Sequence, residues 1–349
     1  MPAFFKVVDI ENDSRWDEFV VEHSRASIYH HSAWIKVLAS TYDYKPVGLA
    51  LENADTGKLE GILPFFLVES RWTGRRLVSL PYTSYCEKLL PESQLSRIID
   101  FAAQLYPRLD YIELRFLAEE GLAGLDDLKR SDDYSAHILD LDKDLDEIFR
   151  SFHDKCVRKR IKRAERMGLN FRITDEELDL KRFYTLETIV RQRHCLPPPP
   201  YRFFDNMWKI LKPLGYFLLA VVECKSKIIA AAIVLKFKDK FHLEYSASDR
   251  RALKLAPNQK LIWELIKMAH HDRARYLDFG RTASANRSLR EFKERWGAQK
   301  RALSYCYFPS AKKPGRENSF ARRFICRINR LLPAALLKLE GELLFPHLG

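Results

Sequence analysis

The chain has 349 residues, of which 46% are hydrophobic and 30% charged. This balance is typical of a soluble folded protein, fits about two domains, and excludes intrinsic disorder. The formal net charge is +12, and the basic excess is concentrated in residues 155–166 and 311–349, so each of these segments needs its own explanation.

The sequence carries no sign of secretion or of a membrane span. Its start has no basic stretch followed by a long apolar one, and its longest apolar runs fall short of the roughly 20 residues that cross a bilayer. The six cysteines include no C-x-x-C pair. We therefore expect a cytoplasmic protein with free thiols.

The first half of the chain has the pattern of a strand hairpin followed by a strand–helix–strand unit. Short β-rich runs at 46–51 and 61–68 flank a polar turn, and a further strand is predicted at 76–80. A helix follows, with one apolar face, and then a strand at 111–116. The residues of that face are Leu95, Ile98, Ile99, Ala102 and Leu105.

The second half repeats this order. Strands are predicted at 216–222, 228–237 and 241–246, then a helix with Leu261, Leu265, Met268 and Ala269 on one face, then a strand at 276–280. Corresponding points are about 165–169 residues apart. The sequence therefore predicts an internal duplication with an α/β or α+β architecture around mixed sheets.

Between the two halves the periodicity predicts one long helix over 145–168. Leu145, Phe149, Phe152, Cys156 and Met167 would share one side, and Lys155, Arg158, Lys159, Lys162 and Arg166 the other. Like charges four residues apart repel, so this face either binds an anion or is a solvated surface. Arg191, Arg193 and His194 then precede four prolines, Pro197–Pro200, which form either a rigid linker or the edge of a substrate groove.

Common catalytic motifs are missing from the sequence. There is no P-loop, G-x-G-x-x-G, H-E-x-x-H or G-x-S-x-G, and the histidine pairs 30–31 and 270–271 are adjacent and not four apart. We expect no metal site.

Seven segments in order resemble the Fem-type (FemAB-like) acyltransferases of the GNAT superfamily, particularly the group associated with exopolysaccharide and PEP-CTERM (exosortase) systems. They cover roughly residues 5–308. The segments are HHSAWIKVL from His30, SLPYTSY from Ser79, VRKRIKRAERMGL from Val157, RQRHCLPPPP from Arg191, APN from Ala256, DFGRT from Asp278 and FKERWG from Phe292.

The resemblance implies two tandem GNAT-like domains, 1–144 and 145–310, each a mixed, mostly antiparallel sheet flanked by helices. The family pattern fades past Phe308, and the composition of 311–349 predicts an amphipathic helical tail. The resemblance also implies transfer of an acyl or aminoacyl group to an amine of a cell-envelope or exopolysaccharide precursor. The donor would be acyl-CoA or an aminoacyl-tRNA, a co-substrate and not a permanently bound cofactor.

The same resemblance implies site residues. The carrier's pyrophosphate would lie at the start of the helix from Asn258, which suits a helix N-terminus, although RALKLAPN lacks the usual glycines. Lys293, beside Phe292, would neutralise the oxyanion, and Asp278 would accept a proton or orient Arg281. The full predicted binding set is Arg158, Lys159, Lys162, Arg191, Arg193, His194, Tyr245, Arg250, Arg251, Asn258 and Phe292.

Other functions stay open at this point. One alternative is a plain acetyl-CoA-dependent N-acetyltransferase, and another is a non-catalytic binding or scaffold protein of a polysaccharide assembly system. Nucleic-acid binding as the main role is disfavoured because residues 155–166 contain no aromatic side chain for base stacking. The expected partners are an anionic carrier and an envelope or polysaccharide precursor, not DNA.

The tail predicts a basic amphipathic segment. At 100° per residue Phe320, Phe324, Ile328 and Leu331 cluster, next to Arg322, Arg323, Arg327 and Arg330. This pattern is typical of a helix lying in a membrane interface. We therefore expect peripheral contact of 312–349 with the inner membrane, the alternative being a helix packed back on the second domain.

Overall fold

The computed structural model describes residues 3–117, 129–309 and 328–349, which fall into two compact units. The first unit contains the described residues up to Ser135 together with 302–309 and Leu343–Gly349, and the second contains Ala136–Arg301 and 328–342. The units and the predicted domains, with boundaries at 144 and 310, divide the chain at different points.

The first unit is built on a six-stranded sheet in the order β1-β2-β3-β4-β5-β12. Its strands β1 to β4 are antiparallel, β4 and β5 are parallel, and β12 is antiparallel to β5. Its elements are β1 (Ala3–Val8), α1 (Ser14–Glu22), η1 (Ile28–His30), α2 (Ser32–Tyr42), β2 (Lys45–Asn53), β3 (Leu59–Ser70), β4 (Gly74–Val78), η2 (Glu92–Gln94), α3 (Leu95–Leu105), β5 (Tyr111–Leu117) and β12 (Gln299–Phe308).

The second unit repeats this sheet in the order β7-β8-β9-β10-β11-β6. Strands β7 to β10 are antiparallel, and β10 and β11 are parallel. Its elements are β6 (Lys129–Asp140, of which the residues from Ala136 on belong to this unit), α4 (Leu145–Ser151), η3 (Asp154–Arg158), α5 (Lys159–Arg166), β7 (Asn170–Thr174), α6 (Glu177–Arg193), α7 (Tyr201–Leu211), β8 (Phe217–Cys224), β9 (Lys227–Phe237), β10 (Lys240–Ser248), η4 (Arg250–Leu255), α8 (Pro257–His271), β11 (Tyr276–Ala283) and α9 (Arg287–Glu294).

The predicted duplication and the α+β class are confirmed by this shared order. In each unit a helix, α3 or α8, leads from the fourth strand to a strand parallel to it, as a crossover connection requires. The last strand of each sheet comes from the other half of the chain, because β12 pairs with β5 and β6 pairs with β11. The sequence pattern did not predict this exchange.

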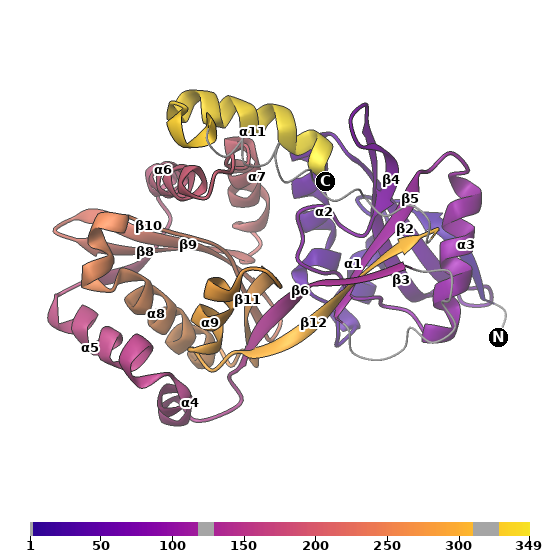
Figure 1. The fold of residues 1–349 in the computed structure, drawn as a ribbon. Helices are drawn as coiled ribbons and strands as arrows, with labels where there is room; N and C mark the ends of the chain where they lie inside the picture. The colour runs from indigo at the N-terminus through magenta and orange to yellow at the C-terminus, as the bar shows by residue number, and fades with distance from the viewer. Residues whose placement is uncertain (1–2, 118–128, 310–327) are drawn as a thin grey trace. The chain divides into compact units, whose positions relative to one another are not determined.

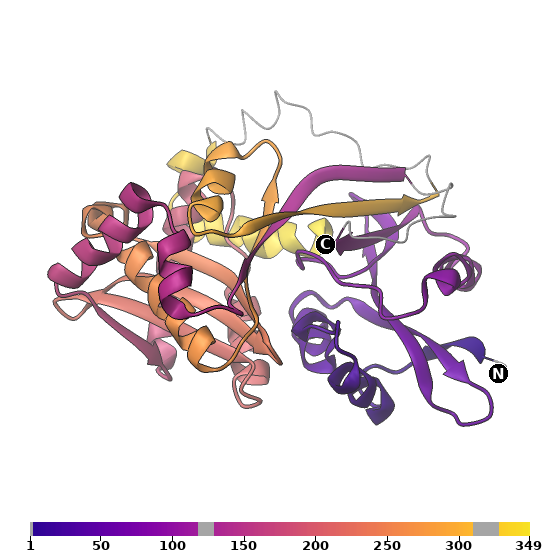
Figure 2. The ribbon, with the colours of Figure 1, turned by 90° about the horizontal axis from the view of Figure 1, so that it is seen from below.

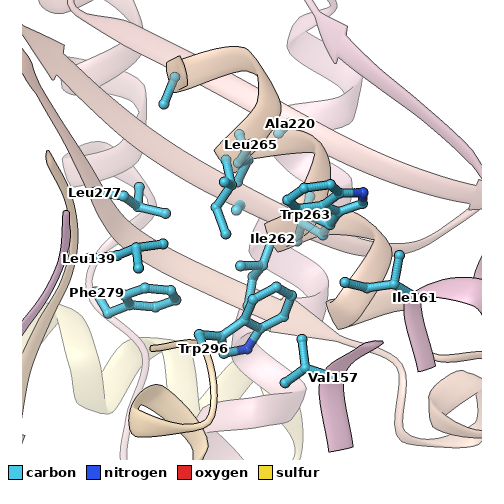
Figure 3. Packing of buried hydrophobic residues seen from close by; sticks show 14 of the residues in the cluster. Leu139, Val157, Ile161, Ala220, Ile262, Trp263, Leu265, Leu277, Phe279 and Trp296 are labelled. Atoms are coloured by element: carbon cyan, nitrogen blue, oxygen red, sulfur yellow. The ribbon is translucent and has the colours of Figure 1, made fainter. Parts of the chain in front are cut away.

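The core of the second unit lies between the sheet and helices α5 and α8. Trp296 is fully buried, and Trp263 is buried with 8% of its surface exposed. The ring of Phe152 packs edge-on against both indoles, with a centroid distance of 5.7 Å to Trp263 and of 5.1 Å to Trp296. Figure 3 shows Ile262 beside the two indoles, in one buried cluster with Val157 of η3 and Ile161 of α5. In Figure 1 and Figure 2, helix α5 lies beside α8.

The single helix predicted over 145–168 is wrong. Helix α4 ends before Phe152, whose backbone is extended, and the His153 side chain then caps the next turn by accepting from Cys156 N. The break lets Phe152 enter the core and shifts the helical phase. As a result Val157, Ile161 and Ala164 are buried, while Met167, predicted on the apolar side, is exposed.

The expectation of free thiols holds for Cys86, Cys156, Cys224 and Cys306 but is wrong for Cys195, which is disulfide-bonded. Cys326 lies outside the described residues. A disulfide depends on which cysteines meet in space. The spacing rule that predicted free thiols considers only neighbours along the chain.

Only part of the predicted tail is described, since Phe320, Arg322, Arg323, Phe324 and Arg327 lie outside the described residues. Helix α11 (Ala334–Leu348) buries Leu337 and approaches the proline segment so closely that a Cβ at Gly341 would lie 2.1 Å from Pro198 O. Among the described residues, no helix is both long and apolar enough to cross a membrane.

Candidate functional site

Of the three predicted catalytic residues, Asp278 and Arg281 lie on strand β11, and Lys293 contacts the backbone of this strand. Lys293 on α9 is 5% exposed, and its Nζ donates hydrogen bonds to Gly280 O (2.8 Å) and Arg281 O (3.1 Å). The amino group therefore does not point into bulk solvent. An ammonium has three N–H donors, so one remains beyond these two bonds.

Burial changes the acidity of Lys293. Removing the ammonium from water lowers the pKa of Lys293 to about 8, and the nearby Asp278 carboxylate opposes this shift. Near neutral pH the side chain is mostly charged but can lose its proton easily. This is the range that acid–base and oxyanion chemistry require.

Asp278 is also buried, at the last residue pair that joins β10 to β11. Its Oδ1 accepts a hydrogen bond from Gly280 N (2.7 Å), and its Oδ2 lies 3.5 Å from His242 Nδ1. Gly280 has a positive φ of 71°, a conformation that glycine adopts without strain. This turn brings the Gly280 N–H to the carboxylate and the Gly280 carbonyl to Lys293. Arg281, which follows, is exposed.

His137 and Thr282 also lie at this cluster, and neither was predicted as a site residue. His137 on β6 is fully buried, and its Nδ1 lies 3.4 Å from Thr282 Oγ1. Burial and the charge of Lys293 lower the pKa of His137 to about 4, so the ring is neutral at physiological pH. The buried Nε2 of His137 has no hydrogen-bond partner among the described residues. The sequence could not have predicted His137 as a site residue, because residues 129–136 are mostly polar and do not show the pattern of a strand.

The cluster lies where two parallel strands part. The pairing of β10 with β11 covers three residue pairs and ends at His242↔Asp278, although both strands continue. Beyond this point β10 has an irregularity between Leu243 and Tyr245. Diverging strands turn main-chain donors and acceptors toward a ligand instead of toward each other.

Tyr245 and Arg191, both predicted binding residues, are electrostatic neighbours in the same unit. Burial is the main cause that raises the pKa of Tyr245, and Arg191 and Arg281 both act against it. The Arg191 guanidinium is held by the buried Glu187 carboxylate at 2.7 Å. Arg193 and His194 are exposed at the end of α6. The segment after them packs against Tyr184, whose hydroxyl donates to Pro199 O (3.2 Å).

The predicted carrier segment forms η4 and the start of α8. Arg250 and Arg251 are exposed, and Arg251 pairs with Asp249 at 3.0 Å. Ala256 caps α8 with a positive φ of 62°, at the place where the resemblance leads us to expect glycine. The buried Oδ1 of Asn258 has no hydrogen-bond partner among the described residues. The structure thus provides a helix N-terminus with two exposed arginines in the preceding turn, which suits phosphate.

The basic side chains of η3 and α5 lie on the outer surface of the second unit. Arg158 and Lys159 both pair with Asp154, at 3.3 Å and 3.1 Å, whereas Lys162 is exposed and has no ion pair among the described residues. Phe292 is partly buried against the core. That Lys293 and the segment 250–258 face one cleft stays a prediction.

Within the described ranges, no group of three or more His, Cys, Asp and Glu side chains could hold a metal ion. The cluster itself offers a buried ammonium, a carboxylate, a neutral imidazole and backbone dipoles. Such groups can transfer protons and stabilise an oxyanion.

Comparison with known proteins finds a family similarity that covers Asp278 and Lys293. Residues 151–294 match the acetyltransferase (GNAT) domain family. No curated protein matches the chain. Among solved structures it is similar to FemX, with a TM-score of 0.70 and 16% identity over 86% of this chain and 96% of that one.

Two other solved structures share the fold over most of their length. One is the C-terminal domain of a putative lysylphosphatidylglycerol synthetase from Agrobacterium fabrum, with a TM-score of 0.56 and 12% identity over 89% of this chain and 93% of that one. The other is a tandem GNAT protein from the clavulanic acid biosynthesis pathway, with a TM-score of 0.51 and 11% identity over 90% of this chain and 100% of that one.

The residues that match the family include Asp278, Lys293 and the point where β10 and β11 separate. The likeness to the solved structures extends to both units. Residues 151–294 thus match the acetyltransferase (GNAT) domain family, and the chain shares its fold with FemX and with a tandem GNAT protein.

Proposed function

We propose that the chain transfers an acyl or aminoacyl group from a phosphate-bearing carrier to an amine of a cell-envelope or exopolysaccharide precursor. The observation that carries this proposal is Lys293, a buried ammonium held at the strand parting inside the GNAT domain. Such a group has a clear use in acyl transfer. It has none in a scaffold, which is why we prefer catalysis to the non-catalytic alternative.

The chemistry follows from the positions of two groups. The acceptor amine attacks the carbonyl carbon of the ester or thioester, so a C–N bond forms and the carbonyl oxygen becomes negative. The remaining N–H of Lys293 stabilises that oxygen. The nitrogen becomes an ammonium as the neutral amine adds, and Asp278 takes a proton from it. The C–O or C–S bond to the carrier then breaks, with the proton passing to the leaving oxygen or sulfur.

The carrier is either acyl-CoA or an aminoacyl-tRNA, both of which carry phosphate. Arg250, Arg251 and the N-terminus of α8 are the proposed phosphate contacts. The acetyltransferase description of the matched family supports acyl-CoA. The likeness to FemX and to a domain named for lysylphosphatidylglycerol synthesis supports an aminoacyl donor and an envelope acceptor.

An acceptor in the envelope would place the enzyme at the inner membrane, and we propose peripheral contact through 312–349. Helix α11 presents Leu336, Leu339 and Leu343 on one exposed face, each at least 50% exposed. The double substitution Leu336→Gln/Leu339→Gln should reduce flotation with anionic liposomes at low salt. Equal flotation of the variant and the wild type would contradict this contact.

The test of the transfer itself compares donors directly. Purified protein is incubated with acetyl-CoA or with aminoacyl-tRNA and a panel of amine acceptors, and release of the free carrier is measured. Lys293→Met should lower the rate by about a hundredfold or more, the usual effect of removing an oxyanion donor. The matched control is Lys267→Met, on the exposed side of α8. A panel with no turnover, or equal rates for both variants, would overturn the proposal.

A further inference from the structure

The turn between β3 and β4 in the first unit presents a tryptophan to solvent. All six tryptophans of the chain lie in its described part. Trp16, Trp34 and Trp296 are fully buried, whereas Trp72 is 65% exposed, the largest exposed fraction of the six. A single exposed apolar side chain is ordinary, so its neighbours decide whether Trp72 marks a binding surface.

The backbone of this turn is held in one conformation. Ser70 Oγ accepts hydrogen bonds from Trp72 N and Thr73 N, both at 3.1 Å. Gly74 has a positive φ of 84°, and a Cβ at this position would collide with Asp110 Oδ2, so the turn requires glycine there. A fixed backbone presents the indole in one place, which lowers the entropy cost of binding through it.

Helix α11 meets this turn through His347. The ring of His347 packs on the Trp72 indole at a centroid distance of 4.1 Å, and its Nδ1 lies 3.1 Å from Ser70 Oγ. Leu343 lies four residues before His347, so the two side chains share a face of the helix, and Leu343 is 60% exposed. Trp72, His347 and Leu343 therefore form a continuous row within the first unit, which we call the indole ridge.

The charges beside the indole ridge favour an anionic bilayer. Arg75 is paired with Glu69 at 2.7 Å, whereas Arg71 is exposed and has no ion pair within the described ranges. Basic side chains add to binding near anionic lipids, and indoles concentrate at the level of the headgroups, where one edge meets water and the other meets acyl chains. An exposed leucine on a helix beside them supplies the apolar contact.

We propose that the indole ridge of Trp72, His347 and Leu343, together with Arg71, is a membrane-contact surface of the first unit, with Trp72 at the headgroup level of an anionic bilayer. This rests on the peripheral membrane contact proposed above, which it extends from α11 to the β3–β4 turn. The ridge lies outside the residues that match the GNAT domain. Two elements that touch one bilayer fix the orientation of the first unit on it more strictly than one helix does.

The test uses the full chain and vesicles of equal parts phosphatidylglycerol and phosphatidylcholine at low salt. Trp72→Ala should weaken binding in flotation about tenfold, because a large apolar side chain leaves the interface. The matched control is Phe4→Ala, since Phe4 is an aromatic side chain of the same unit that is 47% exposed on β1. Arg71→Gln should weaken binding to these vesicles but not to phosphatidylcholine alone.

Fluorescence quenching locates the indole directly and needs only a conservative variant. In vesicles whose acyl chains are brominated near the headgroup, a tryptophan that enters the bilayer loses its emission. The wild type should be quenched on binding, and Trp72→Phe should still bind but lose most of this quenching. The other tryptophans are buried or half-buried, so they contribute little to it.

The outcomes separate the indole ridge from the contact proposed for α11. Equal quenching of the wild type and Trp72→Phe, or equal losses of binding in Trp72→Ala and Phe4→Ala, would overturn the ridge. Quenching that depends on Trp72 while Leu336→Gln/Leu339→Gln floats like the wild type would support the ridge and contradict the α11 contact. A wild type that does not float would overturn both. A dimer in sedimentation that Trp72→Ala converts to a monomer would mark a surface between copies of this chain and overturn the lipid contact.

Discussion

Burial lowers the pKa of Lys293, so the charged form of this side chain reduces the free energy of unfolding. The pKa of Lys293 falls from 10.5 to about 8 on folding, and each unit corresponds to about 1.4 kcal/mol. From about pH 8 to pH 10.5 the unfolded chain holds more protons at this lysine than the folded one. Unfolding free energy therefore rises with pH across this window as the penalty fades.

This sign gives a prediction for Lys293→Met. The variant has no buried ammonium, so it does not lose unfolding free energy at pH 7 for this reason. In the wild type this loss should be smaller by about 1 kcal/mol at pH 9 than at pH 7, because Lys293 is then mostly neutral. The unfolding free energy of the wild type, relative to that of the variant, should therefore increase by this amount between pH 7 and pH 9. Urea unfolding at both pH values measures it. A difference that stays constant would show that Lys293 keeps its ordinary pKa.

Ala256 shows a second effect at the scale of one residue. Its φ of 62° places a Cβ in the left-handed region just before α8, which costs a residue other than glycine about 1 kcal/mol. Ala256→Gly should therefore raise the unfolding free energy by up to about 1 kcal/mol, measured by urea unfolding. Ala252→Gly, in the preceding η4 turn without a positive φ, should lower it by about 0.5–1 kcal/mol. Destabilisation by both glycines would contradict the strain at Ala256.

At the scale of elements, helix α5 tests what the basic face does. Arg158 is partly neutralised by Asp154, but Lys162 is not paired within the part of the chain that the structure describes. If this face binds the carrier's phosphates, Arg158→Glu/Lys162→Glu should raise the apparent KM for the carrier roughly tenfold at low salt, because each phosphate contact contributes strongly there. The salt dependence of KM should also become shallower.

The control for this prediction matches the change in charge. Lys225→Glu/Lys227→Glu alters two exposed lysines at the turn between β8 and β9 and should leave KM nearly unchanged. Similar effects in both pairs would mean that net charge alone matters. Unchanged kinetics in the α5 pair would leave that face as a solvated surface.

Elements with a strong local pattern were predictable from the sequence. The hairpins of β2–β3 and β8–β9 and the amphipathic helices α3 and α8 all follow their apolar periodicity. Strands β6 and β12 were missed because their partners lie far away in sequence, as Leu303↔Leu117 shows. The break before His153 was missed because burial of Phe152 outweighed a helical period that continues through it.

The same distinction holds for the candidate site. Lys293, Asp278 and Arg281 were found because they lie in motifs that resemble a family. His137 reaches the cluster on the exchanged strand β6, and no local pattern encodes a strand exchange. Arg76 donates a hydrogen bond to Gly349 O, 273 positions further along the chain. Contacts of this kind become visible only in the folded chain.

At the scale of the whole molecule, the duplication has produced two separate apolar cores. The cluster around Ile262, Trp263 and Trp296 lies entirely in the second unit, and the cluster around Ile98 and Leu114 lies entirely in the first. Each core is a set of side chains that pack on their own sheet. Removing buried methyl groups should therefore loosen mainly the unit that contains them.

This gives a prediction with two matched variants. Ile98 and Ile262 are both buried isoleucines on the helix that follows the fourth strand of their unit, and changing either to alanine should cost about 2–5 kcal/mol. Hydrogen exchange followed by mass spectrometry should show faster exchange in α3, β3 and β5 for I98A, and in α8, β9 and β11 for I262A. Each variant is the other's control, because the chemical change is the same. Equal acceleration of both sets of elements in both variants would mean that the chain opens as one cooperative structure, so that the repeated unit in the sequence is not the unit of stability.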